Sequence, residues 1–247
     1  MQNISINLVI PQGWYDLSEK QLRFVFRLIA DGFNSDELKI LCLLRWSKLK
    51  VIGRRECGAY LLKKDKIIFE LTPLTLAEVL PFLDWLGSVP SYPVRLAKIK
   101  GRDALPADFV GVPFEKFIMA DNLYQGYLHT QDDSLLDELA GVLYGGVISL
   151  NPAERISVFY WMASLKHFFA RKFSDFLQPA AVASDGNLLG SSSPNVEEAM
   201  NAQIRALTKG DVTKESQILA IDTWRALTEL NAQAREYKEM NAKINNK

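Results

Sequence analysis

The segment from Asn151 to about Leu177 constrains the fold of this chain more than any other. It opens with Asn-Pro-Ala-Glu, where Asn151 can cap the first helical amides, Pro152 suits the first helical position and Glu154 can bond back to the cap. The helix is apolar around most of its circumference, through Ile156, Phe159, Trp161, Met162, Leu165, Phe168, Phe169, Phe173 and Phe176. A surface helix would keep a wide polar face, so this helix is predicted to be central to the core.

The N-terminal third carries the patterns of short strands. Alternating or β-branched apolar runs predict strands at residues 4–10, 51–52, 60–62 and 67–71. Turn residues at Cys57-Gly58 and Lys64-Asp65 separate the last three runs. A small antiparallel sheet beside helices is the simplest arrangement of these elements.

Helical spacing of apolar residues predicts most of the remaining elements. The predicted helices cover residues 17–32, 35–46, 75–86, 113–130, 132–144, 151–177 and 195–209, and another follows residue 213. Ser35 is expected to cap the second helix, and Pro81 to kink or break the third. Residues 94–99 have a strand pattern. The predicted fold class is α+β and mainly α-helical, with a small antiparallel sheet in the N-terminal third.

Composition along the chain predicts its division into domains. Residues 179–194 are dominated by Ala, Ser and Gly, which is typical of a flexible linker. Residues 1–178 are therefore predicted to form the main body and residues 195–247 a helical C-terminal tail. A proline-rich and basic connector at 88–112 marks an alternative boundary inside the body.

The C-terminal helix carries an apolar stripe on an otherwise polar sequence. Its candidate partner-binding residues are Trp224, Leu227, Leu230, Ala234 and Tyr237, and the spacing continues through Asn241 to Ile244. The stripe can fold back onto the body, dock on another chain (including a second copy), or stay disordered. Aromatic residues at two of these positions suit an anchoring role in an interface.

Motifs for catalysis, metal binding and cofactor binding are missing from the sequence. The chain has two cysteines and two histidines, without zinc-ligand spacing, and it contains neither a phosphate-binding loop nor a nucleophile elbow. The adjacent carboxylates Asp132 and Asp133 stand at a predicted helix start, where negative charge is favourable. The sequence therefore predicts no catalytic residue, no metal and no cofactor.

Overall charge gives no general reason to bind nucleic acid, because 29 basic residues balance 29 acidic ones. A local basic hairpin is the exception, with Arg54, Arg55, Lys63 and Lys64 as candidate nucleic-acid contacts. The alternatives are a solvated sheet edge, which lysines protect from unwanted pairing, and a site for an acidic protein. A second basic run is formed by Arg95, Lys98, Lys100 and Arg102.

Residues 11–21 read Pro-Gln-Gly-Trp-Tyr-Asp-Leu-Ser-Glu-Lys-Gln, which resembles the pattern P-x-x-W-x-x-L-[ST]-x-x-Q of proteins encoded among bacteriophage and prophage virion and tail-assembly genes. Residues 113–130, 139–144 and 226–231 are similar to phage proteins of Bacteroidetes. The resemblance covers about a quarter of the chain and includes no catalytic residue.

This resemblance implies a non-enzymatic phage assembly protein, either a tail-assembly chaperone or a virion connector. Its partners would be other phage structural or assembly proteins or a second copy, with no small-molecule substrate. The N-terminus does not read as a signal peptide and no apolar run reaches the ~20 residues of a membrane span, so the bacterial host cytoplasm or the virion is expected. The alternatives are a DNA-associated accessory protein that uses the basic hairpin and an enzyme of unrecognised chemistry.

Overall fold

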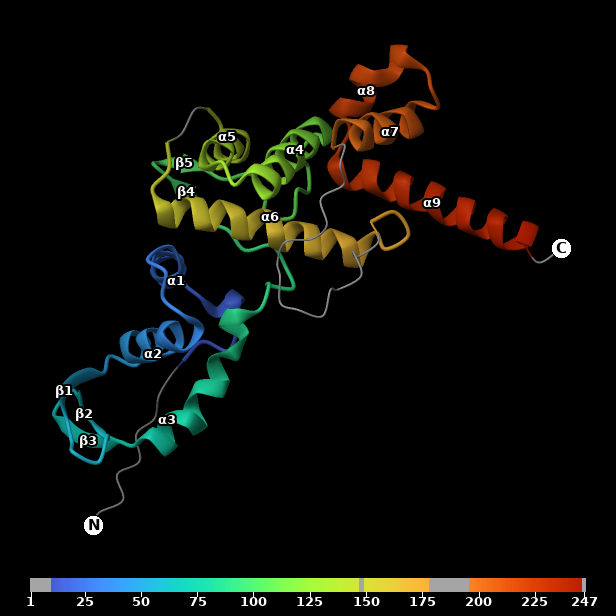
Figure 1. Cartoon of the computed structure of the whole chain (residues 1–247). Helices are drawn as coiled ribbons and strands as arrows, with labels where there is room; N and C mark the ends of the chain where they lie inside the picture. Colours follow the sequence, from blue (N-terminus) through green and yellow to red (C-terminus); the bar gives the residue numbers. More distant parts are fainter. Residues whose placement is uncertain (1–9, 147–148, 178–195, 246–247) are drawn as a thin grey trace. The chain divides into compact units, whose positions relative to one another are not determined.

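A computed structural model describes residues 10–146, 149–177 and 196–245 of the chain. The chain separates into two compact units, Met1–Val89 and Pro90–Lys247 (Figure 1). Most of the described residues are helical, and a three-stranded antiparallel sheet lies in the first unit. The predicted fold class, mainly helical α+β, is confirmed. The expected strand at 4–10 and linker at 179–194 fall outside the described residues, apart from residue 10.

Two capped helices begin the first unit after a short 3-10 turn, η1 (Trp14–Asp16). Helix α1 (Glu19–Ala30) starts with a capping box between Ser18 and Gln21, and α2 (Ser35–Trp46) starts with another between Asn34 and Glu37. The prediction of Ser35 as the cap was wrong by one residue. Asn34 takes the role because its amide oxygen accepts from two backbone amides, at 3.1 and 3.0 Å.

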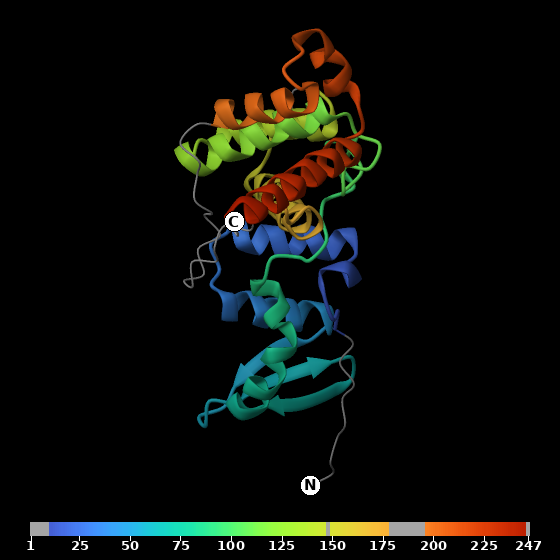
Figure 2. The same ribbon diagram turned by 90° about the vertical axis from the view of Figure 1, so that its right-hand side faces the viewer.

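The sheet of the first unit has the strand order β1–β2–β3, from β1 (Lys50–Arg54), β2 (Tyr60–Lys64) and β3 (Ile67–Leu71) (Figure 2). Both strand pairs are antiparallel, and the β1–β2 register shifts at a bulge. Asp65 adopts a positive φ of 53° in the tight turn between β2 and β3. Strand β2 ends at Lys64, just before this turn, and it is the central strand of the sheet because it pairs with both β1 and β3.

The segment after the sheet is interrupted at Pro81, as the sequence predicts. Helix α3 (Pro73–Val79) gives way to the 3-10 segment η2 (Leu80–Gly87). Proline lacks the amide donor that an α-helix needs at this point, which accounts for the break. The indole of Trp14 donates to the carbonyl oxygens of Trp85 and Ser88 at 3.0 and 3.1 Å, so η1 is tied to the end of η2.

The second unit is mostly helical. It contains the two-residue strands β4 (Lys98–Ile99) and β5 (Arg102–Asp103), helices α4 (Phe114–Thr130), α5 (Asp133–Tyr144), α6 (Pro152–Lys172), α7 (Val196–Thr208), α8 (Glu215–Ala220) and α9 (Thr223–Asn245), and the 3-10 turn η3 (Val212–Lys214). The predicted strand at 94–99 is reduced to its last two residues. The amide of Val94 instead donates to the Ser164 hydroxyl of α6 at 3.2 Å.

Helix α6 is the central helix of the second unit, as predicted. Trp161, Met162, Leu165 and Phe169 are all 0% exposed. The predicted capping box is present, with both Asn151–Glu154 hydrogen bonds at 3.0 Å. The helix ends at Lys172, five residues earlier than expected.

The C-terminal segment belongs to the second unit and does not form a separate tail. The Thr223 amide and hydroxyl both donate to the carbonyl oxygen of Val112, at 2.8 and 2.7 Å. The Phe114 amide donates to the carbonyl oxygen of Ile221 at 2.8 Å. These bonds join the start of α4 to the start of α9, so the expected division after residue 178 is not observed. The observed boundary, after Val89, lies inside the alternative range of 88–112.

Replacing Phe169 by alanine tests the central position of α6. The ring is fully buried and lies against Phe117, Phe173 and Trp224 at centroid distances of 5.5 to 5.9 Å. We expect Phe169→Ala to lower the free energy of unfolding by about 3–5 kcal/mol, measured by denaturant titration. Tyr237→Ala is the control, because that side chain is 66% exposed and its loss should change the stability by less than about 0.5 kcal/mol. Equal effects would contradict a buried α6.

Candidate interaction surfaces

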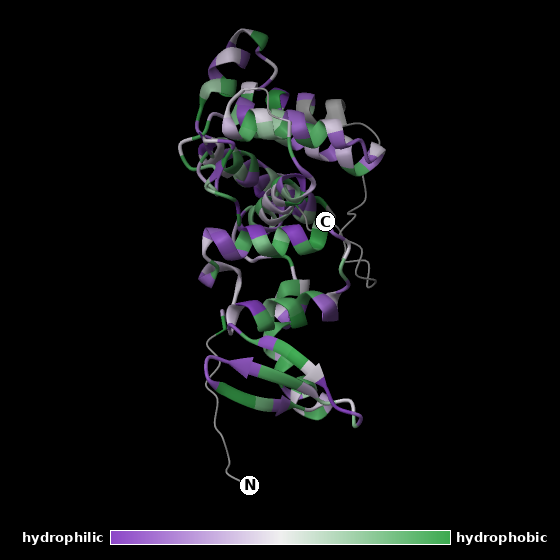
Figure 3. Ribbon diagram, turned by 90° about the vertical axis from the view of Figure 1, so that its left-hand side faces the viewer, coloured by the Kyte–Doolittle hydropathy of each residue, from purple (hydrophilic) through white to green (hydrophobic). Residues whose placement is uncertain are grey.

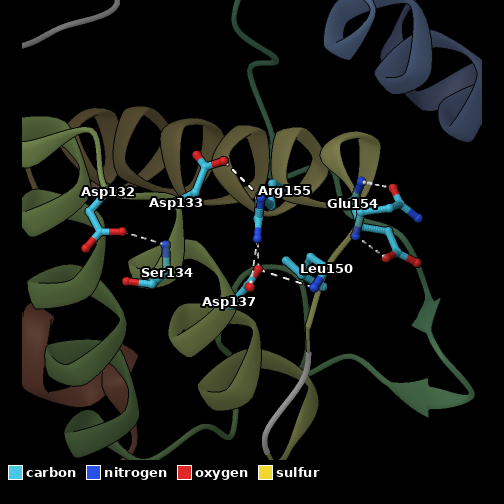
Figure 4. Close-up of polar contacts among 8 residues, drawn as sticks. Asp132, Asp133, Ser134, Asp137, Leu150, Glu154 and Arg155 are labelled. Carbon is cyan, nitrogen blue, oxygen red and sulfur yellow. Dashed lines mark hydrogen bonds and ion pairs between the residues drawn. The ribbon is translucent and has the colours of Figure 1, made fainter.

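The charged cluster between α5 and α6 is structural. Arg155 lies between two aspartates of α5 and bonds both through its guanidinium group (Figure 4). Its Nε and Nη2 atoms donate to the two carboxylate oxygens of Asp137, and Nη1 donates to Asp133, all at 2.9 Å. Asp137 also accepts from the Leu150 amide at 3.2 Å. This bidentate contact between Arg155 and Asp137 holds the start of α6 against α5.

The aspartates of this cluster stabilise the fold as ionised carboxylates. Hydrogen bonds from Arg155 lower the pKa of Asp137, although partial burial acts in the opposite direction. Asp132 caps α5 by accepting from the Ser134 amide at 2.9 Å, and this bond lowers the pKa of Asp132. The interpretation of Asp132 and Asp133 as helix-start residues agrees with these positions. The ion pairs of Asp133 and Asp137 were not predicted.

The first half of the C-terminal stripe is packed inside the second unit. Leu227 is 0% exposed and Leu230 is 2% exposed. The half-buried Trp224 lies against three rings of α6 and the turn after it, Phe168, Phe169 and Phe173, at centroid distances of 5.6 to 5.9 Å. Its indole donates to the carbonyl oxygen of Asp108 at 2.7 Å. Three of the candidate partner-binding residues therefore take the folding-back alternative: Trp224 packs on the aromatic rings of α6 and the turn after it, and Leu227 and Leu230 are buried where α9 meets α4 and α7.

The second half of the stripe is exposed. Ala234 is half-buried, and beyond it Tyr237, Met240 and Ile244 are 66%, 61% and 67% exposed. Their spacing of three and four residues places them along one side of the helix. We call these three residues the α9 stripe. Met240 is not among the residues predicted from the sequence, because the predicted stripe continues through Asn241, although Met240 is three residues from Tyr237.

A polar contact marks where α9 leaves the rest of the second unit. Asn231 accepts from the amides of Asp175 and Phe176 at 2.9 and 3.1 Å. Lys238 reaches Asp175 with an ion pair of 3.4 Å. Figure 1 shows the C-terminal part of α9 extending away from α6. The α9 stripe thus lies on the part of the helix farthest from the core of this unit.

The four candidate nucleic-acid residues do not gather on one surface. Lys63 and Lys64 are consecutive residues of β2, so their side chains point to opposite faces of the sheet. Arg54 lies over the ring of Tyr60 at 5.5 Å. Arg55 is paired with Glu70 at 2.9 Å. The alternative that treats Lys63 and Lys64 as edge protection is wrong, because both lie on the central strand.

The second basic run is held by contacts within its own unit. The guanidinium of Arg95 lies 5.6 Å from the ring of Trp161, and Lys98 pairs with Asp103 at 3.0 Å. Lys100 and Arg102 donate to backbone carbonyl oxygens of the segment between α5 and α6. These cations stabilise the connector and its small hairpin.

Comparison with known proteins finds no family model that matches the chain, and no curated protein or solved structure with significant similarity to it. Within the described ranges, no helix combines the length and the apolar character needed to cross a membrane.

The Arg155–Asp137 pair makes a prediction about acid sensitivity. Because the folded chain lowers the pKa of Asp137, the pair stabilises the fold above the ordinary aspartate pKa, and this stability is lost as the pH falls through the lowered value. Asp137→Asn should lower the free energy of unfolding at neutral pH by about 1.5–3 kcal/mol and flatten its decline between roughly pH 5 and pH 3.

Denaturant titrations across that pH range give the measurement. Asp103→Asn is the matched control, because this carboxylate is 76% exposed in its pair with Lys98 and should leave the pH profile unchanged. An unchanged profile in Asp137→Asn would show that the cluster does not stabilise the fold.

Proposed function

We propose that this protein is a non-enzymatic assembly protein that acts through contacts with other proteins. The observation that carries the proposal is the α9 stripe, in which Tyr237, Met240 and Ile244 are each more than half exposed on one side of a helix. Large apolar side chains grouped in this way are costly in water and are typical of surfaces that a partner covers.

The stripe suits a helix that docks into an apolar groove of a partner. Such helices present anchors three, four and seven residues apart, which is the spacing of Tyr237, Met240 and Ile244. Tyrosine buries a large area at a small cost in side-chain entropy, and methionine adapts to irregular surfaces. The first half of α9 is anchored through Trp224, which packs against Phe168 and Phe173, and it holds the α9 stripe at a defined place on the second unit.

The setting that we propose is the assembly of a phage or prophage particle. Support comes from the pattern Pro11 to Gln21 and the other segments that resemble phage assembly proteins. In this setting the protein is a tail-assembly chaperone or a virion connector, and its partners are other structural or assembly proteins of the particle. It would work in the bacterial host cytoplasm or be incorporated in the virion.

Complementation of a gene deletion tests this function. In the phage or prophage that encodes the protein, deletion should stop particle production while DNA replication continues. A wild-type copy should restore particles, whereas Tyr237→Ser/Met240→Ser/Ile244→Ser should restore about tenfold fewer or none. The control is Arg235→Ser/Glu239→Ser/Lys243→Ser, which changes three exposed polar residues of the same helix and should restore particles fully.

Both triple variants should unfold at the wild-type temperature, because all six side chains are exposed. Full restoration by the apolar triple variant would remove the α9 stripe from the account. Normal particle numbers after deletion of the gene would contradict the assembly function itself.

A further inference from the structure

The two sides of the central strand of the β1–β3 sheet differ in burial. On β2, Leu62 is 1% exposed, whereas the next residue, Lys63, points to the other side and is exposed. The register places Lys50, Lys63 and Ile68 in one row across the three strands. Leu61 and Glu70 stand opposite each other in the next row on the same side. We call Lys50, Leu61, Lys63, Ile68 and Glu70 the outer face of the sheet.

Two cations stand directly opposite each other on the outer face. Lys50 of β1 is the register partner of Lys63 of β2. Like charges at directly opposed positions destabilise a sheet. Glu70 of β3 is engaged by Arg55 at 2.9 Å, and no acidic residue in the described part of the chain pairs with Lys50 or Lys63. The outer face therefore has two adjacent positive charges that a carboxylate would neutralise.

The apolar part of the outer face lies beside these cations. Ile68 is 52% exposed and is the register partner of Lys63. Leu61 is half-buried and stands opposite Gly53, which has no side chain to cover it. Neighbouring strands are about 4.8 Å apart, so charge and apolar surface alternate within roughly 5–10 Å. Figure 3 shows hydrophobic and hydrophilic stretches side by side on these strands.

The charge of this region also differs from that of the chain as a whole. Residues 48–71 contain seven basic and three acidic residues, a net charge of +4, whereas the whole chain has a net charge of zero. A positive surface of this kind attracts and orients an acidic partner.

We propose that the outer face of the sheet binds an acidic, amphipathic segment of another protein. One or two carboxylates of that segment bond to Lys50 and Lys63, and an aliphatic side chain covers Ile68 and Leu61. A nucleic acid fits less well, because single-stranded bases stack on aromatic rings, and Tyr60 and Phe69 both point to the Leu62 side of the sheet. The inference rests on the proposed function only in taking the partner to be a protein.

Binding of designed peptides to the full-length protein tests this site. The probe is a fluorescently labelled peptide in which glutamate and isoleucine alternate, and a peptide of alternating lysine and isoleucine is its counterpart. We expect saturable binding of the acidic peptide, weaker at high salt, and no binding of the basic one. Lys63→Glu should weaken binding about tenfold or more, and Ile68→Thr should weaken it less. Lys20→Glu, the same charge change on α1, should leave it unchanged.

Folding of the variants is controlled separately. Lys63→Glu converts the like-charged pair into an opposite-charged one, so its thermal unfolding midpoint should equal or exceed that of the wild type. Ile68→Thr keeps a β-branched residue and provides a second variant if the first fails to fold. The triple serine variant of the α9 stripe should bind the peptide normally, so failure of this site and failure of the proposed function are distinguishable.

Three results would overturn the inference. One is equal affinity of the wild type and Lys63→Glu for the acidic peptide. Another is the absence of saturable binding by that peptide. The third is binding of duplex DNA or of phosphatidylserine-containing vesicles that is lost in Lys63→Glu while the peptide does not bind, because this would identify a phosphate-bearing ligand.

Discussion

The packing of Trp224 against Phe168, Phe169 and Phe173 is the interaction on which the second unit depends. The three rings project from the end of α6 and the turn after it, and the indole also bonds to the carbonyl oxygen of Asp108. This contact joins the connector, the central helix and the C-terminal helix in one core. Without it α6 would expose an aromatic surface, and α9 would lose its aromatic anchor to the central helix.

This arrangement divides α9 into two parts with different roles. Leu227 and Leu230 are buried in the second unit, where α9 packs against α4 and α7, whereas Tyr237, Met240 and Ile244 are exposed. A single amphipathic pattern therefore covers a half that folds back onto the unit and a half that leaves an apolar surface exposed. The exposed part is held in place by the buried part, which reduces the entropy that a partner would have to overcome on binding.

Features that depend on residues close together in the sequence, such as helix caps, could be predicted. Features that depend on contacts between distant residues could not. The capping box of Asn151 and Glu154 depends on residues three apart, and its prediction was confirmed. The strand expected at 94–99 failed because Val94 bonds to Ser164, seventy residues away. The candidate site was predicted only in part, since spacing alone cannot say how much of a stripe is covered. In the hairpin, alternation along the strand would have separated Lys63 from Lys64, but the strand had been expected to end at residue 62.

Hydrogen exchange along α9 in the free protein tests most directly the claim that one helix is half core and half exposed surface. We expect the amides of residues 226–231 to exchange slowly, with protection close to that of α6, and the amides of residues 239–244 to exchange much faster. Uniformly slow exchange would mean that the α9 stripe is already covered in the free protein. Uniformly fast exchange would mean that the contact around Trp224 does not hold the helix, and either result would contradict the account.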